Sequence, residues 1–273
     1  MANPPTIGYK SIAEKWELNS LDTDETYRLI SYKPNKFAIL RWSNNPNTLP
    51  QSENPEYSAT EPLELDQFEA KFQISFKTKI IDHLFKGNGD LWIAFTQKGY
   101  WQLYNADKSR SFREINFQPE LIYNYPINFN LLGFNARTTR ITLNHQSNGR
   151  DIPYSRSWNR IIFHLEMENK NWQLIVRPWI QFENENRENP EINNYIGRAE
   201  FTILYHYKNC EISTIITHPF NKLDRGSIQF DYIVPIKGQL KGFVQFFKGY
   251  GESLIDYNHQ QNTIGFGLTI MDW

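Results

Sequence analysis

The chain of 273 residues has little of three things: cysteine, long apolar runs and excess charge of one sign. A single cysteine, Cys210, excludes an intramolecular disulfide framework and a thiolate metal cluster. No stretch approaches the roughly 20 apolar residues that a membrane-spanning helix needs. Lys and Arg number 29 against 30 Asp and Glu, so charge does not point to nucleic acid as a partner.

The start of the chain, Met1 to Pro5, has neither the basic region nor the apolar region of a secretory signal. This predicts either a mature form with a starting Met or a protein that is not exported.

Aromatic residues are abundant for so polar a chain. They make up 15% of the residues, with 8 Trp, 15 Tyr and 19 Phe, while charged residues make up 22%. A membrane β-barrel permits this combination, because its strands alternate lipid-facing and lumen-facing residues and its aromatics gather at the two interfaces. Composition is compatible with such a barrel but does not by itself indicate one.

Alternation of apolar and polar residues predicts strands along most of the chain. Residues 68–77 alternate without a break. The other predicted strands are 37–43, 91–104, 114–125, 134–147, 158–168, 172–182, 195–207, 211–218, 227–236, 240–249 and 262–272. Several run past ten residues, which suits a tilted membrane strand of about 9 to 11 residues. Residues 1–35 are polar and rich in Pro and Asn, and we expect an arm outside the main fold, with residues 36–273 forming one closed domain.

Two readings of these strands stay open at this point. A soluble β-sandwich also shows alternating strands, with its apolar face buried and its polar face wet. A membrane barrel has the reverse arrangement, with polar residues inside. Alternation alone does not separate the two.

Polar residues interrupt apolar rows at the ends of two neighbouring strands. Side chains two apart share a face, so His145 and Ser147 continue the row of Ile141 and Leu143. Asn159 begins the matching row on the next strand, and pairing of the two strands would set it opposite His145. A His beside a Ser hydroxyl can take its proton during attack on an ester, and an amide can orient the ring.

The alternative is that these residues carry no chemistry. His-x-Ser is a common pattern, the segment 147–149 is good turn chemistry, and Asn159 could cap a loop. An amide also brings no charge to stabilise an imidazolium.

Longer motifs around these residues resemble the outer membrane phospholipase A family. They are NHQSNGR at 144–150, SRSWNR at 155–160, TQK at 96–98 with WQL at 101–103, Ser109 with FRE at 112–114, and GYGESLIDYN at 249–258. The resemblance spans roughly residues 25–273. It implies an all-β fold, a twelve-stranded antiparallel transmembrane β-barrel in the bacterial outer membrane with its active site on the outer barrel surface.

The same resemblance implies the chemistry. Ser147 would be the nucleophile, His145 the general base and Asn159 its orienting partner. Glycerophospholipids and lysophospholipids would lose their acyl chains by ester hydrolysis. The backbone amide near Gly149 would help to form the oxyanion hole.

A calcium ion and a homodimer are further implications of the resemblance. Backbone carbonyls of Ser109 and Arg150 and the hydroxyl of Ser155 would bind Ca²⁺, a hard cation that takes oxygen ligands. Ser109 would come from the partner chain, and Gln97 would pack in the dimer interface. The chain departs from the family at Glu188, which stands where a second calcium site usually has Asp. The competing function is a passive or channel-forming barrel in which His145 and Ser147 are incidental.

Overall fold

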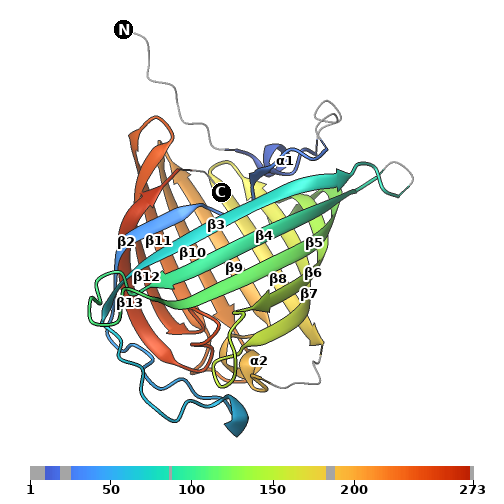
Figure 1. Cartoon of the computed structure of the whole chain (residues 1–273). Coiled ribbons are helices and arrows are strands. Elements are labelled where there is room, and N and C mark those ends of the chain that lie inside the picture. Colours follow the sequence, from blue (N-terminus) through green and yellow to red (C-terminus); the bar gives the residue numbers. More distant parts are fainter. Residues whose placement is uncertain (1–9, 19–25, 86–87, 183–187, 271–273) are drawn as a thin grey trace.

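Twelve long strands form one closed antiparallel barrel in the computed structural model, which describes residues 10–18, 26–85, 88–182 and 188–270 (Figure 1). Pairing of β3 with β4 closes the sheet, and the two-residue strand β1 (Ile30–Ser31) adds to β3. The barrel strands are β2 (Lys36–Ser43), β3 (Phe68–Ile81), β4 (Asp90–Trp101), β5 (Phe112–Leu131), β6 (Phe134–Ser147), β7 (Ser157–Asn169), β8 (Trp172–Phe182), β9 (Ala199–Tyr207), β10 (Cys210–His218), β11 (Ser227–Lys237), β12 (Leu240–Tyr250) and β13 (Gln260–Thr269). The predicted twelve-stranded barrel is confirmed.

Helix is confined to short segments: α1 (Ile12–Lys15), α2 (Ile192–Tyr195) and a 3-10 turn at Pro55–Tyr57. Among the described residues, no helix has the length and apolar character to cross a membrane.

The barrel is apolar outside and polar inside. On β6 the outward Ile141 and Leu143 are 48% and 49% exposed, while the inward Thr142 and Asn144 are buried. Exposed apolar side chains recur on the outer face of the other long strands, for example Ile264 on β13. This arrangement is the reverse of a soluble β-sandwich, whose apolar face is buried. The sandwich interpretation is therefore wrong, and the outer surface is one that lipid would cover.

The two ends of the barrel differ in the length of their connections. At one end, called the short-turn end, residues 132–133, 170–171, 208–209 and 238–239 join strand pairs, together with the longer connection 82–89. At the other, the long-loop end, the connections are 44–67, 102–111, 148–156, 183–198, 219–226 and 251–259. Bacterial barrels place short turns toward the periplasm and long loops outside the cell. The long-loop end therefore faces the outside of the cell.

Buried ion pairs hold the 251–259 loop inside the long-loop end. Arg41 contacts Glu69 at 2.6 Å and Glu252 at 2.5 Å, and Arg113 lies 3.0 Å from both Glu69 and Asp256. Burial by itself would raise the pKa of the Asp256 carboxyl, but the Arg113 guanidinium, the hydrogen bond from Ser253 and other nearby positive groups together outweigh burial and lower that pKa. Removing one partner of such a network would leave an uncompensated buried charge.

The N-terminal segment enters the barrel rather than lying outside it. Trp16 is 3% exposed and donates its indole N–H to Glu166 at 3.1 Å, and the Ile12 amide donates to Glu168 at 3.0 Å. The Lys77 ammonium lies 3.1 Å from the centre of the Trp16 ring. The expectation of an external arm is thus wrong for residues 10–18, because their apolar side chains find cover and hydrogen-bond partners in the lumen. The division of the chain at residue 35 stays a prediction.

Several predicted strand boundaries also need correction. The strand expected at 114–125 runs from Phe112 to Leu131, and the one expected at 68–77 continues to Ile81. The strand expected from residue 195 begins at Ala199, because Tyr195 ends α2 and Gly197 adopts a left-handed φ of +124° between them. The strand expected to reach residue 104 ends at Trp101, where Gln102 begins a turn closed by the hydrogen bond from the Asn105 amide to its carbonyl at 3.0 Å.

Candidate active site

His145 and Asn159 face each other across β6 and β7, at the long-loop end of the outer surface. They are direct partners in the antiparallel ladder, and Ser147 is paired with Ser157 two residues nearer the loop. His145 is exposed and continues the outward row of Leu143. The register therefore sets the three predicted catalytic residues together at the rim of the apolar band, as their alternation indicates.

A hydrogen bond of 2.8 Å joins His145 Nδ1 to Asn159 Oδ1. An amide oxygen only accepts, so this contact keeps the ring proton on Nδ1 and leaves Nε2 as the basic nitrogen. The Ser147 hydroxyl is half-buried and makes no hydrogen bond to the ring in the described structure. Contacts between nucleophile and base commonly shorten only when substrate binds.

The loop after Ser147 is fixed from inside the barrel by two residues that sequence reasoning missed. Asn148 is 3% exposed; its side chain accepts from the Arg156 amide at 2.9 Å and donates to the Tyr154 carbonyl at 2.8 Å. The fully buried Arg156 donates to carbonyls of the 44–67 loop, including that of Tyr57 at 2.8 Å. Both residues lie within the family motifs, but only the three-dimensional contacts reveal that they position the loop.

Gly149 lies in this loop, directly after the buried Asn148. Its φ is +62°, a left-handed conformation that favours glycine, and an added Cβ would lie 3.4 Å from the Phe117 ring. The sequence therefore places glycine where the chain turns sharply away from the end of β6.

Ser155 and Glu188 are brought together although 33 residues separate them. The Ser155 hydroxyl donates to Glu188 Oε1 at 2.9 Å. The second carboxylate oxygen, Oε2, is buried and has no hydrogen-bond partner among the described residues. A buried carboxylate oxygen without a partner is costly, and a cation would satisfy it. Hard oxygen donors of this kind fit Ca²⁺.

The other two predicted calcium ligands lie on neighbouring loops. Arg150 follows Gly149, and its guanidinium donates to the Arg113 carbonyl at 2.9 Å. Ser109 lies in the 102–111 loop with a left-handed φ of +56°. In the described part of one chain, no hydrogen bond joins Ser109 to Arg150, Ser155 or Glu188.

Gln97 places an amide on the apolar outer face of β4. It is flanked in the ladder by Ile74 on β3 and Phe117 on β5, and its side chain makes no hydrogen bond within the described residues. An amide in hydrocarbon is stabilised when it finds a partner, which makes this position suited to contact another chain.

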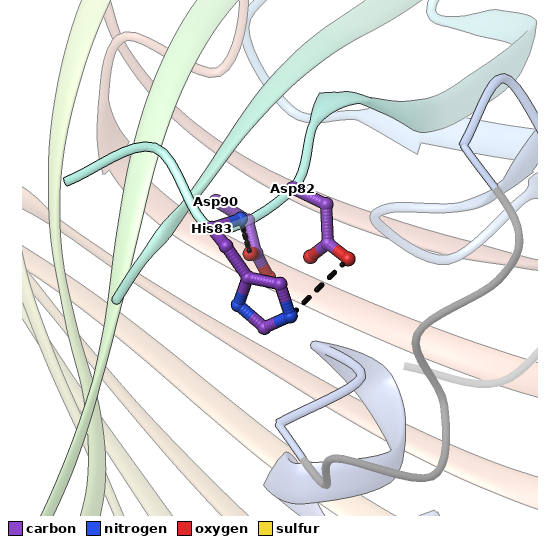
Figure 2. A group of neighbouring side chains, drawn as sticks. All are labelled: Asp82, His83 and Asp90. Atoms are coloured by element: carbon purple, nitrogen blue, oxygen red, sulfur yellow. Dashed lines mark hydrogen bonds and ion pairs between the residues drawn. The ribbon is translucent and has the colours of Figure 1, made fainter. Parts of the chain in front are cut away.

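A second polar group, which sequence reasoning did not single out, lies at the short-turn end. Figure 2 shows Asp82, His83 and Asp90, whose side-chain ligand atoms lie within 4.8 Å of one another. The Lys79 ammonium lies 3.5 Å from both carboxylates and already neutralises part of their charge. This group is at the opposite end of the barrel from His145.

Fold and site together define a class: an outer-membrane β-barrel with a Ser, His and Asn set on its lipid-facing wall. The sequence model of the phospholipase A1 family matches residues 12–270, so the chain belongs to the phospholipase A1 family. It is a bacterial outer-membrane phospholipase.

Individual relatives agree with this assignment. A phospholipase A1 of Escherichia coli is 36% identical over 204 residues, covering 75% of this chain and 70% of its own. The structure of outer membrane phospholipase A from Escherichia coli superposes with a TM-score of 0.80 at 31% identity, covering 89% of this chain and 94% of that one. The Salmonella typhi outer membrane phospholipase, solved as a dimer with bound calcium, gives a TM-score of 0.80 at 31% identity, with 90% and 93% covered.

Proposed function

We propose that this phospholipase hydrolyses acyl ester bonds of glycerophospholipids and lysophospholipids with Ser147 as nucleophile, His145 as general base and Asn159 as orienting partner. The observation that carries the proposal is the 2.8 Å contact between His145 Nδ1 and Asn159 Oδ1 beside Ser147 on the apolar wall. It prepares a basic Nε2 on the face that membrane lipids reach.

Each side chain has one task in the proposed reaction. The Ser147 hydroxyl attacks the ester carbonyl carbon while His145 Nε2 takes its proton. The backbone N–H near Gly149 donates to the oxygen that becomes negative. His145 then protonates the departing glycerol oxygen, and a water molecule activated by the same nitrogen releases the fatty acid from Ser147. Asn159 holds the ring in place through both steps.

Calcium is proposed as the source of the positive charge that Asn159 does not bring. Backbone carbonyls of Ser109 and Arg150 and the hydroxyl of Ser155 would hold the ion. Glu188 stands where the family has a second calcium site, and its buried oxygen without a hydrogen-bond partner among the described residues, beside Ser155, supports a cation there. When bound, Ca²⁺ would stabilise negative charge developing on the ester oxygen. The calcium in the Salmonella typhi structure is a second reason to propose it.

A homodimer is proposed as the active form. Ser109 makes no hydrogen bond to the other proposed ligands within the described residues of one chain, and we propose that the partner chain supplies it. Gln97 presents an amide on the apolar wall, where a second copy could satisfy it. The relative solved with calcium is also a dimer.

Replacing Ser147 with Ala tests the proposed nucleophile. Fatty-acid release from mixed micelles of phospholipid and detergent should fall by on the order of 10³-fold or more, because loss of a serine nucleophile removes the covalent route. Ser157→Ala is the matched control, since Ser157 is the ladder partner of Ser147. We expect it to keep activity within a few-fold. Retained turnover in folded Ser147→Ala protein would contradict the proposal and favour a passive barrel.

A further inference from the structure

A cavity of about 180 Å³ lies inside the barrel. The 251–259 loop lines it at one end, and Lys33, Arg177 and Glu200 separate it from a second cavity of about 120 Å³ beside α1. One water molecule needs about 10 to 15 Å³ of cavity volume. The larger cavity therefore has room for roughly a dozen water molecules, or for a small solute with its hydration shell.

The walls of the larger cavity carry more positive than negative charge. Four of its six cations have carboxylate partners: Lys36 with Asp231 at 3.1 Å, Lys71 with Glu252 at 2.9 Å, Arg177 with Glu200 at 2.8 Å and Lys33 with Glu120 at 3.5 Å. The remaining two, Lys98 and Arg160, have no carboxylate within 4.0 Å among the described residues. Positive charge without a partner is costly inside a protein.

These two cations belong to a row of donors across four adjacent strands. Lys98 on β4, Gln118 on β5, Gln146 on β6 and Arg160 on β7 all line the cavity. The Lys98 ammonium and the amide nitrogens of both glutamines have no hydrogen-bond partner in the described structure, and none of these atoms is sealed from the cavity.

Arg160 adds directed donors to this row. Its guanidinium donates to Asn144 Oδ1 at 2.8 and 3.1 Å, and its Nη1 group has no partner among the described residues. The side chain stacks on Trp158, with 3.8 Å between the guanidinium carbon and the ring centre. The cation is therefore held in place while one donor group stays open to the cavity.

We propose that this lumen cavity binds a small inorganic oxyanion, with Lys98 and Arg160 supplying the charge and Gln118 and Gln146 supplying neutral hydrogen bonds. An ion with several acceptor oxygens matches a wall of several unused N–H donors, and its charge offsets the two unpaired cations. The site lies inside the barrel, whereas His145 is on the outer wall, so this proposal does not depend on the catalytic one.

Equilibrium dialysis with radiolabelled inorganic phosphate tests the proposal on the full chain in detergent micelles. We expect saturable binding of one phosphate per chain, and Lys98→Met should raise the dissociation constant about tenfold or more, because it removes a charged donor. Lys208→Met is the matched control, since Lys208 is exposed in the turn between β9 and β10 and its loss changes net charge equally. That variant should bind phosphate as the wild type does.

Gln118→Leu provides a second, neutral variant should Lys98→Met fail to fold; we expect it to weaken phosphate binding about fivefold by removing one hydrogen bond. An arm with equimolar chloride should leave phosphate binding unchanged. The proposal is overturned if phosphate does not saturate, if folded Lys98→Met and Gln118→Leu bind it as the wild type does, or if chloride displaces it at equal concentration.

Discussion

Replacing Asn159 with Ala removes one contact from the proposed triad. The 2.8 Å hydrogen bond to His145 Nδ1 disappears, while the ladder that pairs the two positions stays intact. The His145 ring then loses the group that fixes its tautomer and orientation, but no charge is lost, because an amide is neutral. The fall in turnover therefore measures how much orientation of the His145 ring alone contributes to the rate.

The expected loss follows from the strength of a neutral hydrogen bond. Such a bond contributes about 0.5 to 1.5 kcal/mol net, and each 1.36 kcal/mol corresponds to a factor of ten in rate. Asn159→Ala should thus lower the turnover of phospholipid by about two- to twelvefold. Loss of the charged third member in a Ser-His-Asp enzyme costs on the order of 10⁴-fold, because the imidazolium also loses its counter-charge.

The assay is fatty-acid release from phospholipid micelles at saturating calcium. Asn169→Ala is a suitable control, since Asn169 also lies on β7 but donates to the Gly133 carbonyl at the short-turn end. A loss of 10³-fold or more in Asn159→Ala would refute the reasoning, since orientation by a neutral amide could not account for it. Unchanged activity would equally remove Asn159 from the triad.

Three further predictions address calcium, the dimer and the N-terminal segment. Glu188→Gln should raise the calcium concentration that gives half-maximal turnover about tenfold, because a ligand charge is lost. Full chelation of calcium should abolish the activity of the wild type. An unchanged calcium requirement in the variant would exclude Glu188 as a ligand. Gln97→Leu should weaken dimerisation in micelles about three- to eighteenfold, from the roughly 0.6 to 1.7 kcal/mol of a hydrogen bond between chains in a membrane. Analytical ultracentrifugation measures this, and an unaffected dimer would place Gln97 outside the interface. Trp16→Ala should destabilise the docked N-terminal segment by about 3 to 5 kcal/mol, seen as faster proteolysis near α1 with the barrel itself intact. Unaltered protection would show that Trp16 does not hold the segment.

The strands were predictable from the sequence because they are long and alternate regularly, whereas the barrel was expected only from the family resemblance. A period of two puts successive side chains on opposite faces, so Ile141, Leu143 and His145 had to share one face once a strand formed there. Alternation does not determine which face of the sheet contacts water. Closure of twelve strands decided this, since it enclosed the polar rows and left the apolar ones outside.

Contacts between segments that are distant in the chain could not be predicted from the sequence. Glu188 meets Ser155, Trp16 meets Glu166, and Asn148 organises its loop from inside, yet none of these relations follows from local periodicity. The charge balance of the lumen is also a tertiary property, because Lys98 looks like any strand lysine until its neighbours are known.

The sequence by itself thus determined the strands, the face of each side chain and, through its motifs, the resemblance to a phospholipase family. Tertiary structure decided whether the two strands pair as the sequence suggested, with His145 opposite Asn159. It alone decided the docking of the N-terminal segment in the lumen and the two cations left without carboxylates. The physical reason is the distance along the chain over which each property is determined. Side-chain direction is set by the local backbone, whereas hydrogen bonds and charge pairing depend on which strands become neighbours when the barrel closes.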